Sequence, residues 1–203
     1  MNHQQVFINS TPADLRKRQI HHCPRCGARL SEQRLKKHQR QICPACRYTH
    51  YLNPSPGVTV IVPSKERQVL IAKRAEEIDF GGKWCLPGGY VEYEESFIDA
   101  AFREVGEETG LAIRLAGIVN VVSNLCNGDH HTLVVVLLAE AVGAQPVAGD
   151  DCTEVKWIDQ GQHQDIDYAF EADRRIIDGY FNGHLQMIPI DERFRIKPFP
   201  AKN

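Results

Sequence analysis

One acidic stretch of the sequence contains the side chains best suited to chemistry. Positions 92 to 108 hold seven Asp or Glu residues, and Arg103 is the one basic residue among them. On a helix Glu104 and Glu108 share a face and Glu107 borders them, so their charges repel. Gly106 costs a helix about another 1 kcal/mol relative to Ala. A sequence that accepts both costs indicates that the carboxylates are used, and hard cations such as Mg²⁺ prefer oxygen ligands.

A helix over residues 96–109 is predicted to position these carboxylates. Ser96 is placed to cap its N-terminus, with Asp99 three residues further on in the capping-box position. Gly110 is placed to end the helix in a left-handed turn. The alternative is an ordinary solvated acidic face. The paired glycines upstream, residues 81–82 and 88–89, favour a ligand site because glycine lets the backbone approach a ligand closely.

Two cysteine doublets form a second candidate site. Each reads Cys-Pro-x-Cys, and sixteen residues separate them; the four residues are Cys23, Cys26, Cys43 and Cys46. Two such turns aim four sulfurs at one point, with zinc–sulfur bonds of about 2.3 Å. Four thiolates leave the metal no open position, so a structural Zn²⁺ is expected, and it would supply most of the folding free energy of this segment. A redox dithiol pair is the less favoured alternative.

Charge and composition divide the chain into segments. Residues 14–50 hold ten Lys or Arg and two acids, whereas residues 51–203 hold 14 bases and 24 acids. Asn53-Pro54-Ser55-Pro56-Gly57 forms a stiff turn between them. The predicted domains are an N-terminal extension (1–20), a zinc ribbon (21–55) and a larger domain that carries the chemistry (56–203).

The overall composition, 42% hydrophobic and 25% charged, is typical of a globular protein and excludes a disordered or fibrous one. No apolar run approaches the roughly 20 residues needed to cross a bilayer. The first 13 residues lack the apolar stretch of a signal peptide. We therefore expect a cytoplasmic protein with no membrane partner.

The larger segment alternates strand and helix patterns. Residues 58–62 and 68–72 are predicted to form a hairpin. Further strands are predicted within 112–125, 132–141 and 155–158, and a second helix over 168–181. Strands flanked by an early and a late helix predict a mixed α/β sandwich.

The acidic helix and its flanks also carry a recognisable pattern. Gly89, Glu95 and the run Arg103-Glu104-Val105-Gly106-Glu107-Glu108-Thr109-Gly110-Leu111 match the Nudix box, Gly-x5-Glu-x7-Arg-Glu-apolar-x-Glu-Glu-x-Gly-apolar, at every defined position. The preceding Trp84-Cys85-Leu86-Pro87-Gly88 is similar to the lead-in common in that family. The resemblance implies an α/β/α sandwich with a mixed sheet, preceded by the zinc ribbon. It also implies hydrolysis of a nucleoside diphosphate linked to another group, with Mg²⁺ or Mn²⁺.

The resemblance also assigns roles to individual residues. Glu104, Glu107 and Glu108 would hold the metal ions, and the carbonyl near Gly88 or Gly89 could add a ligand. Glu95 and Arg103 would pair and orient the helix, a supporting task. A carboxylate is needed to take the water proton. The resemblance leaves open whether this base is a glutamate of the box or a residue on a later loop. On the later loop we favour Glu154 over its neighbours Asp150 and Asp151.

The substrate is less constrained than the chemistry. A zinc ribbon before a Nudix domain resembles NADH diphosphatases, but residues 115–132 show no trace of the further motif that marks them. The compact ribbon is more similar to ribbon-bearing FAD and ADP-ribose diphosphatases, so FAD or ADP-ribose is expected, with release of AMP. An aromatic wall would bind the adenine or flavin ring, with Phe80, Tyr90, Tyr93 and Phe170 as candidates.

Several alternatives stay open. NADH or NAD, an oxidised nucleoside triphosphate or a capped RNA could be the substrate. A non-catalytic nucleotide sensor, a nucleic-acid-binding regulator or a zinc-ribbon interaction module would be a different class of protein. The basic ribbon could contact phosphates, but Tyr48 and Tyr51 are its only aromatics, so nucleic acid is the less favoured partner. The resemblance also implies a homodimer.

Overall fold

The computed structural model describes residues 7–8, 20–35, 37–126, 130–143 and 145–196. Most of the predicted N-terminal extension (1–20) therefore lies outside the described residues. The described chain divides into two compact units, with the main boundary between Pro54 and Ser55. None of the helices in the described ranges is long and apolar enough to cross a membrane.

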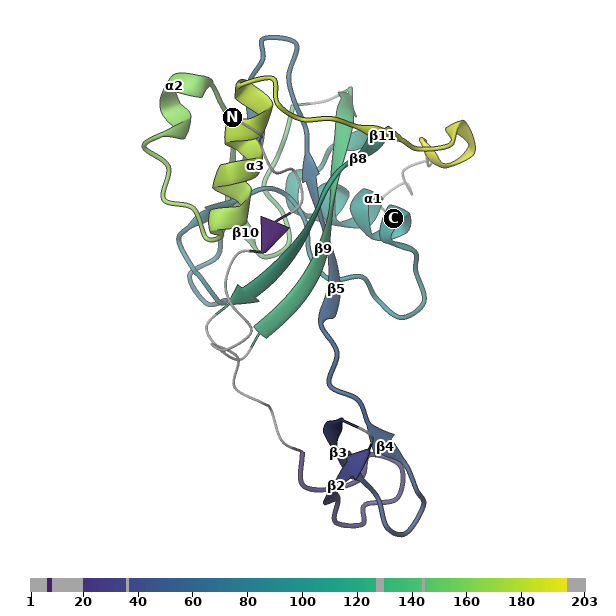
Figure 1. Ribbon diagram of the computed structural model, residues 1–203. Helices are drawn as coiled ribbons and strands as arrows, with labels where there is room; N and C mark the ends of the chain where they lie inside the picture. The colour runs from purple at the N-terminus through teal and green to yellow at the C-terminus, as the bar shows by residue number, and fades with distance from the viewer. Residues whose placement is uncertain (1–6, 9–19, 36, 127–129, 144, 197–203) are drawn as a thin grey trace, which may run out of the picture. The chain divides into compact units, whose positions relative to one another are not determined.

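The smaller unit is a three-stranded antiparallel sheet with two cysteine turns. Its strands are β2 (Ser31–Leu35), β3 (His38–Ile42) and β4 (Thr49–His50), in that order across the sheet (Figure 1). Among its described residues, the buried side chains are those of Cys23 and Cys43. Burial of apolar side chains therefore contributes little to the stability of this unit.

The larger unit contains a mixed sheet. Its strands run in the order β1-β8-β9-β5, with β1 parallel to β8 and β5 parallel to β9, and β11 adds an antiparallel pairing to β8. The bounds are β1 (Phe7–Ile8), β5 (Ser55–Ile61), β8 (Ala112–Cys126), β9 (His130–Val142) and β11 (Ile188–Pro189).

A second, antiparallel sheet has the order β10-β6-β7, with bounds β10 (Cys152–Ile158), β6 (Val69–Arg74) and β7 (Trp84–Cys85). The predicted hairpin of 58–62 with 68–72 is wrong in its pairing. The connecting turn closes through a hydrogen bond from Ser64 N to Gln68 O (2.8 Å) and one bridge of Pro63 to Val69. The two strands then separate, because β5 pairs with β9 whereas β6 pairs with β10 and β7.

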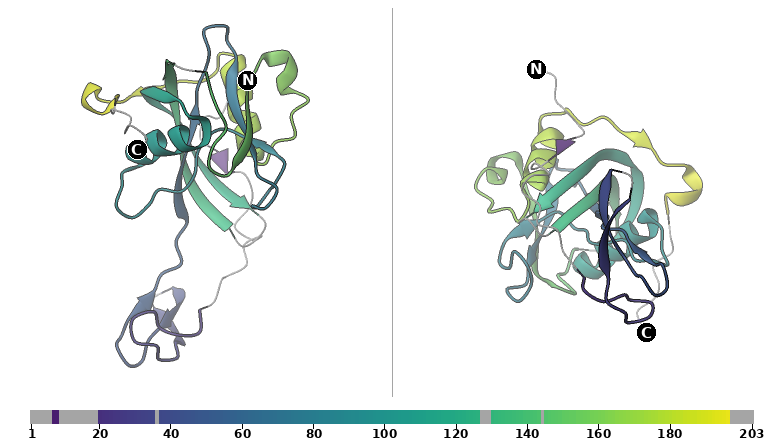
Figure 2. Two further views of the ribbon diagram at one scale, coloured as in Figure 1. Left: turned by 180° about the vertical axis from the view of Figure 1, so that it is seen from behind. Right: turned by 60° about the horizontal axis from the view of Figure 1, so that its bottom comes forward.

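The larger unit has two hydrophobic cores, and successive side chains along a strand belong alternately to one core and to the other. Val60, Leu70 and Leu137 belong to the core that holds Ala101 and Val105 of helix α1 (Phe97–Thr109). Their sequence neighbours Ile61, Ile71 and Val136 belong to the core of helix α3 (Glu171–Phe181). Successive strand side chains point to opposite faces, so α1 and α3 cover opposite sides of the sheets. Helix α3 faces the viewer in Figure 1 and α1 in the left view of Figure 2. The predicted α/β/α sandwich is confirmed.

The helix ends follow from local chemistry. Ser96 caps α1 in a full capping box with Asp99, and Gly110 closes it at φ 67°, as predicted. Helix α3 begins at Glu171, three residues later than expected, because Tyr168 and Ala169 continue an extended path along Trp84. The short helix α2 (Gln160–His163) and a 3₁₀ turn (Glu192–Phe194) complete the unit.

Candidate active site and metal centre

Helix α1 presents its glutamates to different environments. Glu108 is 2% exposed and Glu104 is 9% exposed, whereas Glu107 is exposed to solvent. The same helix packs Ala100, Ala101 and Val105 into the core. The acidic face is therefore partly folded into the protein, contrary to an ordinary solvated face.

Glu108 is the most buried carboxylate of the motif. One of its oxygens accepts a hydrogen bond from the N–H of Gly88 at 2.9 Å. Burial raises its pKa to about 8, and the nearby negative charges of Glu104 and Asp151 act in the same direction. A bound cation would offset this desolvation of a carboxylate.

Glu104 lies against the glycine loop that precedes the helix. Burial raises the pKa of Glu104, and the Arg103 guanidinium opposes that rise. A Cβ atom added at Gly89 would overlap the Glu104 carboxylate. Glycine at position 89 therefore leaves room for the carboxylate, which would have to move if this residue carried a Cβ.

Arg103 connects the acids of the motif. Its guanidinium binds the Glu95 carboxylate through two hydrogen bonds, Nε–Oε2 at 3.1 Å and Nη2–Oε1 at 2.6 Å. It also donates to Glu104 at 2.8 Å, to Glu107 at 3.0 Å and to the carbonyl of Tyr90 at 3.0 Å. These acids hold the pKa of Arg103 above its ordinary value. The structure thus pairs Glu95 with Arg103, as expected for residues that orient the helix.

The loop at residues 86–89 is held from three elements. The carbonyls of Pro87 and Gly89 accept hydrogen bonds from Val60 N (2.8 Å) and Val58 N (2.9 Å) of β5. Gly88 donates to Glu108 of α1, and a Cβ at Gly88 would overlap the Val58 carbonyl. The Gly88 amide therefore lies directly beside Glu108.

The third hold on this loop comes from α3. The N–H of Leu86 donates to Asp173 Oδ2 at 3.0 Å. Asp173 is 5% exposed, and burial raises its pKa to about 7. Asp173 was not among the residues predicted from the sequence. Its position could have indicated it, because it lies three residues before Ile176 and four before Ile177 and therefore shares the apolar side of its helix.

The later acidic loop also reaches α1. Gly149 N donates to the Glu108 carbonyl at 3.0 Å, and Val147 N donates to the Thr109 carbonyl at 2.8 Å. One ligand atom from each of Glu108, Asp151 and Cys152 lies within 4.8 Å of the others. Asp151, which the sequence analysis ranked below Glu154, therefore lies beside the motif.

Glu154 lies on β10, two residues after Cys152. It is exposed, on β10 opposite Lys73 of β6. It is not in the group formed by Glu108, Asp151 and Cys152.

The aromatic candidates separate into two kinds. The rings of Phe80 and Phe170 meet edge to face, with centroids 5.2 Å apart, and the Arg74 guanidinium lies 5.7 Å from the Phe170 centroid. Tyr90 is 50% exposed and Tyr93 is fully exposed. The structure therefore brings Phe80 and Phe170 together as one ring pair, and Tyr93 forms no part of an enclosed surface.

The oxygen donors around Glu108 fit a hard divalent cation. Glu108 offers a carboxylate oxygen close to Asp151, and the Gly88 amide lies beside it. Glu104 and Glu107 lie on the same helix, but Arg103 binds both carboxylates, and within the described ranges they do not join Glu108 in a group whose ligand atoms all lie within 4.8 Å. Oxygen donors of this kind suit Mg²⁺ or Mn²⁺. The thiol of Cys152 is a soft exception in the group, and burial raises its pKa.

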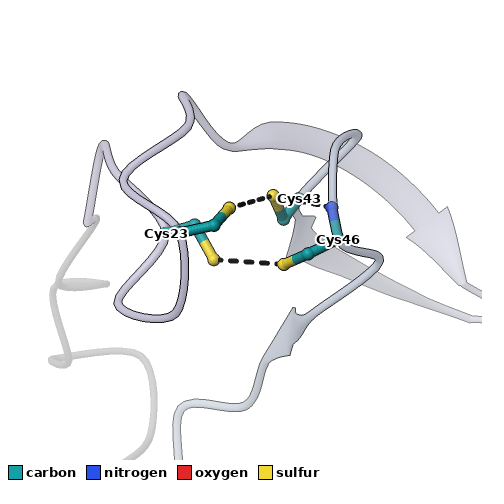
Figure 3. Close-up of side chains that lie close together, drawn as sticks. Cys23, Cys43 and Cys46 are labelled. Carbon is teal, nitrogen blue, oxygen red and sulfur yellow. Dashed lines mark hydrogen bonds between the residues drawn. The ribbon is translucent and has the colours of Figure 1, made fainter.

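The four cysteines of the smaller unit form a second centre. Sulfur–sulfur distances are 3.6 Å for Cys23–Cys46 and 3.5 Å for Cys26–Cys43. Figure 3 shows the sulfurs converging from two turns. Disulfides would require about 2.05 Å, whereas a tetrahedral Zn²⁺ site with bonds of about 2.3 Å needs sulfurs roughly 3.8 Å apart. The donor set therefore fits Zn²⁺.

The two cysteine turns have the same backbone design. Gly27 N donates to Cys23 O and Arg47 N donates to Cys43 O, both at 2.9 Å. Gly27 has φ 72° and Arg47 has φ 61°. Both turns thus use a left-handed residue after the second cysteine, although the second turn lacks the glycine that favours this conformation.

Comparison with known proteins agrees with this geometry. Residues 53–180 match the family described as NUDIX domain. An ADP-ribose pyrophosphatase of Methanocaldococcus jannaschii is 32% identical over 134 residues, which cover 66% of this chain and 75% of that protein. The NAD-capped RNA hydrolase NudC of Vibrio cholerae is 34% identical over 96 residues, 46% of this chain and 33% of that protein.

A solved structure supports the same assignment. The crystal structure of a NUDIX hydrolase from Nitrosomonas europaea superimposes with a TM-score of 0.71 and 26% identity, covering 81% of this chain and 93% of that one. The chain therefore belongs to the Nudix family and is a Nudix-type pyrophosphatase, in which α1 and the loop before it form the Nudix box.

Proposed function

We propose that this enzyme hydrolyses the diphosphate of an ADP conjugate, with ADP-ribose or FAD as substrate. Water and ADP-ribose would give AMP and ribose 5-phosphate. The observation that carries the proposal is the buried Glu108 carboxylate, surrounded by Glu104, Asp151 and the Gly88 amide. The similarity to an ADP-ribose pyrophosphatase over 75% of that protein's length supports the substrate class.

Each residue of the site has a part in this reaction. Glu104, Glu107 and Glu108 would hold Mg²⁺ or Mn²⁺, with the Gly88 carbonyl as a further candidate ligand. When bound, the cation would neutralise diphosphate oxygens and lower the pKa of a water. Arg103, which is itself bound by Glu95, would orient the carboxylates of Glu104 and Glu107. Phe80 and Phe170 are the proposed wall for the aromatic ring of the substrate, and the half-exposed Tyr90 is a separate candidate.

Two acids compete for the role of general base. Glu154 is the base expected from the sequence, and Asp151 lies beside Glu108. The variants Asp151→Asn and Glu154→Gln separate them. The variant of the true base should lower kcat by about 10²- to 10⁴-fold, and the other should stay within a few-fold of the unmodified enzyme.

A substrate panel tests the proposed activity. ADP-ribose, FAD, NADH, NAD and nucleoside triphosphates are each incubated with Mg²⁺ or Mn²⁺, and AMP and phosphate are quantified. We expect the highest kcat/KM for ADP-ribose or FAD. Preference for NADH or a triphosphate would refute the substrate assignment, and no cleavage of any diphosphate would refute the proposed activity.

A capped RNA end is the second candidate substrate. The smaller unit is rich in Lys and Arg, and two of its arginines stack on tyrosines, Arg25 on Tyr48 at 5.8 Å and Arg40 on Tyr51 at 5.3 Å. The similarity to NudC points the same way. NAD-capped RNA therefore joins the panel, and a kcat/KM above that of ADP-ribose would favour it.

The remaining features of the proposal concern the whole protein. We propose that Zn²⁺ on the four cysteines is structural, and that the chain works as a homodimer in the cytoplasm. Light scattering coupled to gel filtration would test the dimer: a mass near 23 kDa would contradict it.

A further inference from the structure

The two helices that cover opposite sides of the sheets each place one buried carboxylate on the same short loop. Asp173 of α3 accepts the hydrogen bond of Leu86 N at 3.0 Å, and Glu108 of α1 accepts that of Gly88 N at 2.9 Å. Both carboxylates are at least nine-tenths buried. The two amides are two residues apart, one on each side of Pro87, where the chain bends.

The same loop has little freedom elsewhere. Leu86 is 2% exposed, and Pro87 accepts hydrogen bonds from Val60 N and Thr59 Oγ1. Gly89 lies so close to the Glu104 carboxylate that an added Cβ would displace it. A shift at Leu86 would therefore be passed along the backbone to Gly88 and Gly89, which touch two of the proposed metal-binding carboxylates.

We propose that Asp173 is a positioning residue for the diphosphate-cleaving site, which fixes the Leu86 peptide and thereby the Gly88 amide against Glu108. The proposal rests on the proposed function, since it assigns Asp173 to the catalysis of that same site. It explains why an acid is retained on the apolar stripe of α3 beside Ala172, Ile176 and Ile177. Misplacement of a catalytic group by about 1 Å can cost on the order of 10²-fold in rate.

A purely structural role for Asp173 is the alternative to be tested. Asp173 lies in the first turn of α3, where any acid stabilises the helix dipole. Glu171 lies in the same turn, is exposed and shares that dipole effect. Glu171→Ala is therefore the matched control for Asp173→Ala, and Asp173→Asn keeps an oxygen that accepts the Leu86 N–H.

The first experiment compares kinetics of the full chain with the best substrate of the panel. Asp173→Ala should lower kcat by about 10²-fold with KM changed less than about three-fold, because the substrate contacts remain and the catalytic geometry does not. Asp173→Asn should recover at least about ten-fold of that loss. Glu171→Ala should stay within about two-fold of the unmodified enzyme. Equal kcat for Asp173→Ala and Glu171→Ala would overturn the proposal.

The second experiment does not depend on activity. Amide hydrogen exchange, resolved by residue with NMR, is measured at Leu86 and Gly88 and along α3. In Asp173→Ala both loop amides should lose protection while the amides of α3 keep theirs, and Asp173→Asn should restore both. If protection is lost at Leu86 and kept at Gly88, the proposal that Asp173 fixes the Gly88 amide against Glu108 is overturned. Should Asp173→Ala fail to fold, Asp173→Asn carries the test: kcat within about ten-fold of the unmodified enzyme, with Leu86 and Gly88 still protected, supports the role of the oxygen, and a larger loss of kcat or a loss of protection refutes it.

The two experiments distinguish the two proposals. An enzyme that cleaves no diphosphate refutes the proposed function, and the exchange measurement still decides whether Asp173 holds the loop against Glu108. An active enzyme whose kcat and loop protection do not change in Asp173→Ala refutes the role of Asp173 alone.

Discussion

Glu108 imposes a cost on the folded protein that a catalytic role would explain. Its carboxylate is 2% exposed and lies near Glu104 and Asp151, so its pKa rises from 4.5 to about 8. The folded state therefore binds more protons than the unfolded state between these two pH values. The free energy of unfolding consequently falls as pH rises through that range. A buried Asp173 with a pKa of about 7 adds a fall in the same direction.

The variant Glu108→Gln separates stability from activity. Its amide oxygen still accepts the Gly88 N–H, and it carries no charge. In metal-free buffer at pH 8.5 we expect a free energy of unfolding higher by about 1 kcal/mol or more, since one pKa unit corresponds to roughly 1.4 kcal/mol. Urea denaturation between pH 5 and 8.5 measures this. Parallel curves for Glu108→Gln and the unmodified protein would contradict the account.

Gly89→Ala tests the close approach of the loop to Glu104. The added Cβ would overlap the carboxylate, so Glu104 or the loop must move. We expect kcat to fall by about 10²-fold, with a cost to stability of about 1–3 kcal/mol from overpacking. Steady-state kinetics and urea denaturation measure the two effects. A fully active Gly89→Ala enzyme would show that Glu104 is not needed in its present position.

For individual residues, the sequence predicted only the site residues that lie close together along the chain. The three motif glutamates lie on one helix, so their spacing indicated which side of it they share. The resemblance to the Nudix box implied the pairing of Glu95 with Arg103, which the structure contains. Asp151 and Asp173 reach the site from loops and helices far along the chain, and their approach depends on how β10 and α3 pack. The sequence alone could not rank Asp151 above Glu154, because the two acids lie only three residues apart around the start of β10.

Helix α1 is the element that local sequence predicted best. Its capping box satisfies amides at the N-terminus, and its left-handed Gly110 ends the helix. Strand pairing was harder to predict, because β5 and β6 are joined by a tight turn and yet pair with β9 and β10. The competing partners are distant in sequence, and no local signal of the turn distinguishes them.

Ser96→Ala tests the cap of this helix. The change removes the acceptor for Asp99 N and the partner of the Asp99 carboxylate. We expect a loss of about 1 kcal/mol in the free energy of unfolding, and kcat within two-fold because Glu104 and Glu108 lie two turns or more away. A stability unchanged within experimental error would show that the cap contributes nothing.

The whole molecule combines two units stabilised by different means. The larger unit has two apolar cores, whereas the described part of the smaller unit buries only Cys23 and Cys43. The sequence predicted this contrast, since the segment between the cysteine doublets is short and polar. It also predicted the sandwich, because alternating strands and helices leave few architectures.

Cys23→Ser should therefore unfold the smaller unit alone. Loss of one ligand weakens Zn²⁺ binding, and metal binding supplies the folding free energy of such a unit. NMR signals of residues 20–54 should collapse to unfolded positions while those of α1 and α3 persist. Cys85→Ser, which changes a cysteine outside the four, is the control for the ribbon and should leave its signals in place. A folded ribbon in Cys23→Ser would contradict a structural metal.

The central claim is that the carboxylates of α1 hold a divalent cation for diphosphate cleavage. Its most direct test is the Mg²⁺ dependence of AMP release from ADP-ribose or FAD, measured for the unmodified enzyme, Glu108→Gln and the exposed control Glu94→Gln. We predict turnover that requires Mg²⁺, a loss of about 10³-fold or more in Glu108→Gln, and little change in Glu94→Gln. Turnover without a divalent cation, or a folded Glu108→Gln enzyme with undiminished kcat, would contradict the claim.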